Sequence, residues 1–421
     1  MKKMIFAGCL MVGASVFAQA GETDSLKVVN LQEVQIVSTR ATSKTPVAFT
    51  NVSKEELKKQ HFGQDIPFLL SMTPSALTTS DAGAGIGYTT LRVRGTDGTR
   101  INITANGIPM NDAESHTLFW VNMPDFASSV KDIQVQRGAG TSTNGAGAFG
   151  ASVNMQTEGI SMQPYAEINA SYGSFNAHKE TVKFGTGLLK DHWAFDARLS
   201  NIGTDGYIDR ASVDLNSYYL QGGYFAENTS VKLIAFAGKE KTYHAWGYAT
   251  KEEMEKFGRR YNPCGEMYTD ADGNKHYYTD QTDNYLQKNY QLLLNHSFST
   301  AWNLNVALHY TKGDGYYEEY KPGSSLVEYG LKPFNPDGTE TNESDLVRQK
   351  KMDNKFGGGV FSLNYTGNRL TASLGGGLNQ YRGNNFGKVT WVKNYIGNLS
   401  PEHEYYRNKS KKTDGNIYLK A

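Results

Sequence analysis

Hydrophobic and polar residues alternate along much of the chain after residue 160. In one such segment Phe195 and Leu199 fall on one face, whereas Asp196 and Arg198 fall on the other. A period of two is that of a β-strand whose two faces meet different environments. That segment is residues 193–200, and the same alternation recurs in residues 165–172 and 302–310.

The links between these predicted strands differ in length. Residues 298–302 and 365–369 fit tight turns, whereas residues 239–284 and 313–352 fit long surface loops. Short turns on one side, long loops on the other and aromatic residues at the strand ends are typical of outer-membrane β-barrels. A soluble β-sandwich also alternates, but charged and amide side chains fill the second face of most strands here. That face favours a barrel with a wet interior.

The N-terminus predicts export. Lys2 and Lys3 precede a largely apolar stretch, residues 4–17, and Ala18-Gln19-Ala20 offers a small-x-small cleavage site. The stretch is shorter than the run of about 20 apolar residues that crosses a bilayer as a helix. We therefore expect a signal peptide that is removed after Ala20.

Composition excludes several classes of protein. Hydrophobic residues make up 38% of the chain, which is low for a helical membrane protein, and the net charge of +1 gives no sign of nucleic-acid binding. After the signal, Cys264 is alone, so an intramolecular disulfide is excluded. The 26 tyrosines and 44 glycines suit a barrel, although a secreted all-β binding protein would have a similar composition.

Two arginine-glycine motifs lie ahead of the strands. Arg94-Gly95 ends one short segment, and Arg137-Gly138 leads into the glycine-rich run 138–150. Such a run suits a compact, turn-rich backbone, because glycine in a helix or strand loses the most conformational entropy. This order resembles the TonB-dependent outer-membrane receptors, of the Bacteroidetes-like iron-complex type. The resemblance implies a mainly β protein with a small α/β plug domain inside an antiparallel transmembrane β-barrel.

The resemblance also divides the chain. About eight to ten strands fit after residue 164, fewer than the 22 of the receptors that the chain resembles, and the last residues read as the inside of a strand. We therefore expect the barrel to be truncated in this chain. A complete barrel of that size is the alternative, but side chains would fill its interior and leave no room for a plug. The expected parts are a signal peptide (1–20), a periplasmic segment (21–45), the plug (46–158) and the N-terminal part of the barrel (159–421).

A short alternating segment follows the predicted cleavage site, and it resembles the TonB box. An alternating strand next to a free terminus can add to a sheet of a partner. From the residues alone it is equally a first strand of the plug, and the resemblance favours the TonB box. Its residues are Glu33, Val34, Ile36, Val37, Ser38 and Thr39.

Further motifs fit the plug. Ser53 with Glu56 three residues later predicts a capped helix start. Asn106-Gly107-Ile108-Pro109 predicts a tight turn where the family often has aspartate, and asparagine serves the same turn. The resemblance implies that Arg94 and Arg137 pair with barrel glutamates and hold the plug in place.

Candidate ligand contacts lie in two loops. In the plug, the polar segment after the Asn-Gly-Ile-Pro turn offers Glu114, His116 and Trp120, and it resembles an apical loop that faces the outside. In the loop 239–284, His244 and Trp246 belong to an aromatic-rich stretch that suits adaptable contacts. Each of these side chains has an ordinary alternative role in packing or solvation, and His244 and His276 are not at metal-ligand spacing.

We find no catalytic motif. Residues 83–87 lack the full Gly-x-Gly-x-x-Gly fingerprint, and no nucleophile elbow or zinc-protease motif is present. The resemblance instead implies active transport, without a cofactor, of an iron-siderophore, haem or similar metal chelate. The expected partners are TonB, an extracellular small-molecule ligand and outer-membrane lipid. Cobalamin or oligosaccharide import, the latter with a surface lipoprotein, remains an alternative, as do a porin, a truncated remnant and an adhesin.

Overall fold

The structure is a computed structural model that describes residues 40–43, 45–140, 147–332, 342–395, 399 and 403–421. All of these belong to one compact unit, Glu33–Ala421. The predicted signal peptide, the predicted TonB box (Glu33–Thr39) and residues 141–146 of the glycine-rich run lie outside the described residues.

The plug region, residues 46–158, contains a five-stranded mixed sheet with the order β1-β6-β7-β4-β5. In this sheet β4 pairs with β7 in parallel, and the other neighbours are antiparallel. A separate hairpin joins β2 to β3. The elements are β1 (Ala48–Ser53), α1 (Lys54–Gln60), α2 (Ile66–Leu69), β2 (Ala76–Ser80), β3 (Thr89–Val93), β4 (Ile101–Ala105), β5 (Ile108–Pro109), β6 (Val130–Arg137) and β7 (Ala151–Thr157).

Local sequence explains two features of this region. The Ser53 hydroxyl accepts from the Glu56 amide, and the Glu56 carboxylate accepts from the Ser53 amide at 2.7 Å, so the predicted capping box is confirmed. Between β4 and β5, Asn106 and Gly107 have φ values of 55° and 79°. Asparagine and glycine are the residues that tolerate this left-handed backbone at the least cost, so the predicted turn is also confirmed.

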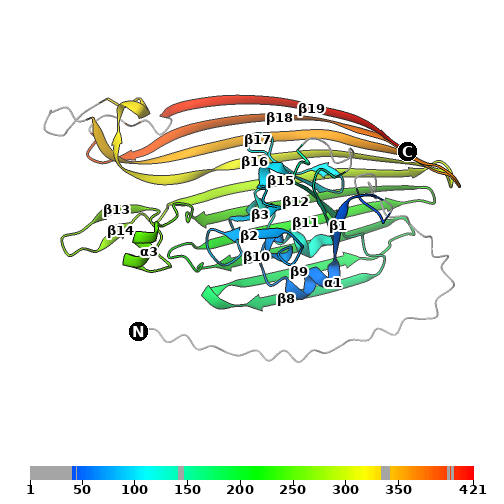
Figure 1. The fold of residues 1–421 in the computed structure, drawn as a ribbon, viewed down its shortest axis with the longest axis horizontal. Helices are drawn as coiled ribbons and strands as arrows, with labels where there is room; N and C mark the ends of the chain where they lie inside the picture. Colours follow the sequence, from blue (N-terminus) through cyan, green and yellow to red (C-terminus); the bar gives the residue numbers. More distant parts are fainter. Residues whose placement is uncertain (1–39, 44, 141–146, 333–341, 396–398, 400–402) are drawn as a thin grey trace. The chain divides into compact units, whose positions relative to one another are not determined.

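The second part of the chain is an antiparallel sheet of ten strands, in the order β19-β18-β17-β16-β15-β12-β11-β10-β9-β8. Strands that follow one another in the chain lie side by side in Figure 1, from β8 in green to β19 in red. Among the described residues, β8 and β19 form the two edges of the sheet. The strands are β8 (Pro164–Tyr172), β9 (His178–Thr186), β10 (Trp193–Thr204), β11 (Val213–Phe225), β12 (Thr229–Tyr243), β15 (Thr282–Ser297), β16 (Trp302–Ser325), β17 (Glu343–Thr366), β18 (Thr371–Val392) and β19 (Glu404–Lys420).

The two faces of this sheet have the opposite burial from that of a soluble sandwich. In β10, Phe195 and Leu199 are 45% and 55% exposed, whereas Arg198 is 2% exposed. Ile168 in β8 is likewise exposed, and its polar neighbours face inward. A sheet whose outer face is apolar and whose inner face is polar suits lipid outside and hydrogen-bonding partners inside. This pattern rules out the sandwich.

The predicted short turns are confirmed, but the predicted long loops are too long. Residues 298–301 join β15 to β16, and residues 367–370 join β17 to β18. On the other side, β12 continues to Tyr243 and β16 continues to Ser325, so each strand takes several residues from its expected loop. Backbone pairing explains the error, because Gly313–Lys321 stay in register with Leu346–Asn354. Polar residues on both faces hid these strand ends from a pattern argument.

The remaining loop between β12 and β15 has structure of its own. It contains one helix and a small hairpin, and its free thiol, Cys264, is buried. These elements are α3 (Lys251–Phe257), β13 (Glu266–Thr269) and β14 (Lys275–Tyr277).

The main hydrophobic core lies mostly within the plug region and extends to the inner face of the sheet. Phe126 of the plug region contacts Tyr219 of β11 and Phe236 of β12, with ring centroids 6.4 and 5.0 Å apart. Gly238 in β12 allows a close approach of the plug backbone, because a Cβ there would meet Pro124 and the Asn122 carbonyl. The inner face thus holds the plug region by direct packing.

Candidate ligand-binding site

One buried aspartate joins the plug region to two strands, β9 and β10. Asp125 accepts from His61 Nε2 at 2.6 Å and from Lys179 Nζ at 2.8 Å. Its other oxygen accepts from Thr181 at 2.9 Å and from the Ser200 hydroxyl, and Arg198 of β10 donates to its backbone carbonyl. Asp125 has a φ of 54°, a conformation that aspartate tolerates better than most residues.

The electrostatics of this network fix the charge of Asp125. Burial alone would raise the pKa of its carboxyl, but Arg198, His61 and Lys179 together hold that pKa well below its usual range. Burial lowers the pKa of His61, so this imidazole is neutral at pH 7 and acts as a hydrogen-bond donor. The plug region therefore presents one negative charge to two positive charges of the sheet.

The two predicted docking arginines lie elsewhere. The Arg137 guanidinium donates to the Thr50 hydroxyl at 2.6 Å, inside the plug region. Arg94 is exposed, and its guanidinium lies against Gly138, so the two arginine-glycine motifs meet. Among the described residues, neither arginine forms an ion pair with a carboxylate. The contact seen here has the opposite polarity, with the acid on the plug region and the bases on the sheet.

Glu114 ties the apical loop of the plug region, residues 111–120, to the far strands of the sheet. Its carboxylate accepts from Tyr381 and Asn385 of β18, both at 3.0 Å, and from the Ser410 hydroxyl of β19. Partial burial raises the pKa of Glu114, but these three hydrogen bonds outweigh it and leave the pKa below its usual value. Glu114 is thus an ionised link between the loop and the sheet.

The other two candidates in this loop have different surroundings. His116 is exposed with a φ of 61°, and it lines a cavity of 340 Å³ between the loop and β17 to β19. Trp120 is only 4% exposed and belongs to the main hydrophobic core. As placed, Trp120 packs in this core and does not line the cavity beside His116.

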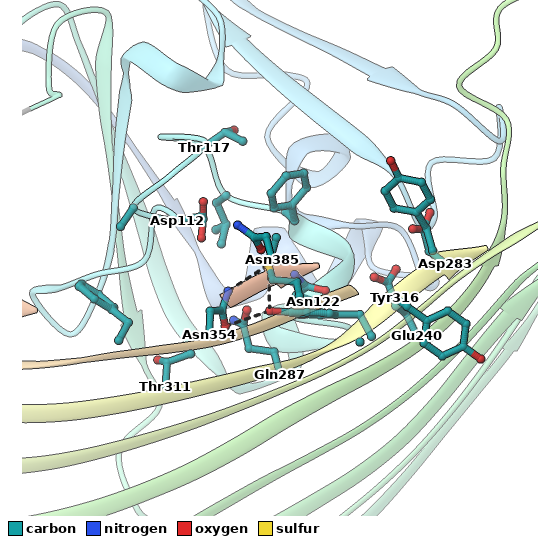
Figure 2. Close-up of a pocket in the computed structure, with 18 of the residues that line it drawn as sticks. Asp112, Thr117, Asn122, Glu240, Asp283, Gln287, Thr311, Tyr316, Asn354 and Asn385 are labelled. Carbon is teal, nitrogen blue, oxygen red and sulfur yellow. Dashed lines mark hydrogen bonds between the residues drawn. The ribbon is translucent and has the colours of Figure 1, made fainter. Parts of the chain in front are cut away.

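A larger cavity of 480 Å³ lies on the other side of the apical loop. Figure 2 shows Glu240 and Asp283 together at one end of it, with Asp112 and Thr117 of the plug region at the other. Its walls come from the plug region and from the long strands β12 and β15 to β19. The aromatic residues that line it are Tyr88, Phe119, Trp246, Tyr285, Tyr316, Tyr317, Phe356, Tyr381 and Tyr406.

His244 and Trp246 mark the rim of β12 beside this cavity. The Trp246 ring lines the cavity and packs against His244, Tyr88 and Tyr317, with centroids 4.4, 6.0 and 5.5 Å away. His244 is buried, and its Nε2 lies 3.4 Å from Asp283. Burial lowers the pKa of His244 to about 4, so the ring is neutral at pH 7. Of the two, Trp246 has a surface that a ligand can reach.

Sequence reasoning missed the acidic end of this cavity. Glu240 and Asp283 sit at the ends of alternating strands, where an inward-facing carboxylate looks like ordinary loop chemistry. Only the pairing of β12 with β15 and the approach of Tyr88 bring these groups together. No sequence signal at a fixed spacing marks such a site.

Two features are absent from the described residues. No group of three or more His, Cys, Asp or Glu side chains is arranged to hold a metal ion. No described helix has the length and apolar character needed to span a bilayer.

Comparison with known proteins agrees with this architecture. Residues 41–152 match the family model of the TonB-dependent receptor plug domain. No curated protein sequence matches the chain significantly.

Solved structures match the whole described fold. The ferripyoverdine receptor of the Pseudomonas aeruginosa outer membrane is 13% identical with a TM-score of 0.62, and the match covers 91% of this chain and 51% of that one. The unliganded ferric citrate transporter FecA is 13% identical with a TM-score of 0.65, with 91% and 54% covered. The copper transporter OprC is 13% identical with a TM-score of 0.61, with 88% and 52% covered. The chain thus spans about half the length of each of these structures.

Proposed function

We propose that the protein imports a scarce ligand across the outer membrane. Residues 41–152 match the plug domain of TonB-dependent receptors, and the chain has the fold of about half the length of such receptors. The process is active transport and involves no catalysis. The ligand binds from outside, in the cavity between the apical loop and the long strands.

One observation carries this proposal: the plug region and the sheet build the cavity together. The loop residues Asp112 and Thr117 face strand residues across the same space (Figure 2). The Glu114 link to Tyr381 and Ser410 runs beside it. A ligand that fills the cavity touches both parts at once, so binding changes the free energy of their contact.

TonB supplies the energy in this proposal. Ligand binding shifts the population in which the segment Glu33–Thr39 is available in the periplasm, and TonB captures that segment by strand addition. Force from the proton gradient of the inner membrane then displaces part of the plug. The Asp125 network joins the plug region to β9 and β10, so this force acts directly on its ion pair and hydrogen bonds.

The proposed cargo is a metal chelate, most simply an iron chelate. The solved structures to which the chain is similar include a ferripyoverdine receptor, a ferric citrate transporter and a copper transporter. A 480 Å³ cavity is of the size that takes a small molecule.

The test is energy-dependent uptake. Cells that carry the protein in the outer membrane are given radiolabelled ferric chelates, haem, cobalamin and oligosaccharides. We expect uptake of an iron chelate that is lost when residues 33–39 are deleted or the tonB gene is removed, while surface binding persists. Replacement of the exposed residues Lys251 and Glu255 in α3 by alanine is the matched control and leaves uptake unchanged. Uptake that persists without TonB, or binding of glycans alone, would contradict the proposal.

A further inference from the structure

We propose that the ligand of the 480 Å³ cavity carries a protonated amine or guanidinium group, which binds between Glu240 and Asp283 while the rest of the ligand lies on the aromatic wall. This inference rests on the proposed function, because it concerns the cargo of the same site. It narrows the cargo from metal chelates in general to ligands with a cationic group on their periphery.

Each carboxylate at this end of the cavity has an oxygen without a partner. Glu240 and Asp283 are 3% and 6% exposed, and both line the cavity. Glu240 Oε2 and Asp283 Oδ2 accept no hydrogen bond from any described residue. A buried carboxylate oxygen without a partner is costly, and a bound cation that donates hydrogen bonds removes that cost.

Other buried polar atoms of the cavity show the same bias. Asn122 Oδ1 and Asn385 Oδ1 also lack a donor among the described residues, and Asn289 Nδ2 lacks an acceptor. Four of these five unpartnered atoms are acceptors. The cavity is therefore prepared for a ligand that donates more hydrogen bonds than it accepts.

The nearby basic side chains do not neutralise this end. His244, 3.4 Å from Asp283, is neutral at pH 7 because burial lowers its pKa. Lys350 Nζ lies over the Tyr317 ring at 5.7 Å, and Lys351 Nζ lies over the Tyr316 ring at 4.6 Å. Among the described residues, no lysine or arginine forms an ion pair with Glu240 or Asp283.

Aromatic rings complete the cation site. The Tyr88 hydroxyl lies beside Asp283, and the Tyr88 ring is 6.0 Å from that of Trp246. Tyr317 packs on Trp246 from the other side, at 5.5 Å with an interplanar angle of 85°. A bound organic cation favours the ionised forms of Glu240 and Asp283, and the ring quadrupoles then act in the same direction as the carboxylate charges. An anionic group would favour the neutral forms of both acids and would find no counter-charge at this end.

Three water-soluble probes test the charge preference directly. Tyramine, tyrosol and 4-hydroxyphenylacetate share a phenol ring and a short arm, which ends in an ammonium, a hydroxyl or a carboxylate. Their affinities for the full chain in detergent are measured by calorimetry and ligand-observed NMR. We expect tyramine to bind at least about tenfold more tightly than tyrosol and 4-hydroxyphenylacetate not to bind. Equal binding of tyramine and tyrosol, tighter binding of the carboxylate, or no binding of any probe would overturn the inference.

Two variants test whether Glu240 and Asp283 are the source of the preference for tyramine. Glu240→Gln and Asp283→Asn keep the shape of the site and should each reduce tyramine affinity about tenfold with little change for tyrosol. Glu227→Gln, in the exposed turn between β11 and β12, is the matched control and should bind tyramine normally. If either cavity variant folds poorly, the probe ranking on the unmodified protein still decides the question. Unchanged tyramine binding in both folded variants would overturn the inference.

These outcomes separate the inference from the proposed function. Probe binding does not require TonB or residues 33–39. Preference for tyramine with TonB-independent uptake contradicts the transport proposal alone, and TonB-dependent uptake with preference for the carboxylate probe contradicts the cation site alone.

Discussion

At the scale of single residues, burial and neighbouring groups give three acidic side chains different charge states and different roles. Asp125 is ionised because basic groups of the sheet surround it. Asp65 sits in the plug region without such basic partners, and burial raises its pKa to about 8. Glu114 is ionised and hydrogen-bonded to two strands. An acidic side chain can therefore anchor the plug region, remain neutral or link a loop to the sheet, depending on the groups that folding places around it.

Replacing Asp125 by asparagine should loosen the plug region. The amide would keep some hydrogen bonds but leave Lys179 and Arg198 buried without a counter-charge, at a cost of about 3–5 kcal/mol. Hydrogen exchange of β6 and protease cleavage of the plug region should both become faster. Asp97→Asn, at an exposed cap, is the control and should change stability by less than about 1 kcal/mol. Equal exchange rates in the two variants would show that the network is not an anchor.

Asp65 should make the plug region less stable as pH rises. Its pKa is about 8 in the folded protein against an ordinary value of 3.8. The folded state therefore binds the Asp65 proton more tightly than the unfolded state does. This proton contributes its full stabilisation below pH 3.8, and the stabilisation is lost as the pH rises through 8. The Thr89 hydroxyl donates to Asp65 at 2.8 Å and can donate equally to an amide oxygen.

Asp65→Asn should remove most of this pH dependence, worth on the order of a few kcal/mol. The measurement is hydrogen exchange of the β3 amides between about pH 5 and 8.5, corrected for the intrinsic pH dependence of exchange. A smaller decline of protection with rising pH should remain in this variant, because Glu240 is a second buried acid close to residue 65. Exposed Asp272→Asn should behave like the unmodified protein. A wild-type profile that is flat over this range would contradict the assignment.

At the scale of elements, strand β12 has two separate tasks. Its outer residues, such as Leu233, face away from the plug region, whereas its inner face contains Phe236 of the core. At Gly238 the plug backbone comes so close that no side chain fits. Glu240, one further inward-facing position along, then lines the cavity. One strand thus seats the plug region and builds the ligand site.

Gly238→Ala should weaken the seating of the plug region without unfolding the sheet. The new Cβ would meet Pro124 and the Asn122 carbonyl, and overpacking of this kind typically costs about 1–3 kcal/mol. Hydrogen exchange should increase in residues 120–130 and remain low in β11 and β12. Gly173→Ala is the control, because its Cβ has only an ordinary contact with Ala177 and its φ of −148° suits any residue. Uniform loosening of the sheet would point to a barrel defect and contradict this role of Gly238.

At the scale of the whole molecule, the apolar surface is on the outside of the sheet and the charged groups lie between sheet and plug region. Lipid stabilises the apolar outer surface. The Asp125 network and the Glu114 link provide partners for the charged groups between the sheet and the plug region. The plug region is therefore held by hydrophobic packing and also by polar contacts, which a change in ligand occupancy or applied force can break one at a time.

The sequence alone determined the features that depend on local order. Period-two alternation with aromatic ends predicted an apolar outer face, and the exposure of Ile168 and Leu199 confirms it. The Ser53–Glu56 pair and the Asn106-Gly107 turn were also readable, since capping and left-handed turns depend on neighbours a few residues apart. Short turns could be placed for the same reason.

The tertiary structure alone decided which polar residues meet. Asp125 and Lys179 are far apart in sequence, and nothing around either one predicts their contact at 2.8 Å. Trp120 looked like a ligand contact in a polar loop, yet the fold packs it into the core. Glu240 and Asp283 become a site only because β12 pairs with β15 and a plug loop closes over them. Burial and charge pairing depend on distant chain segments, so local patterns cannot fix them.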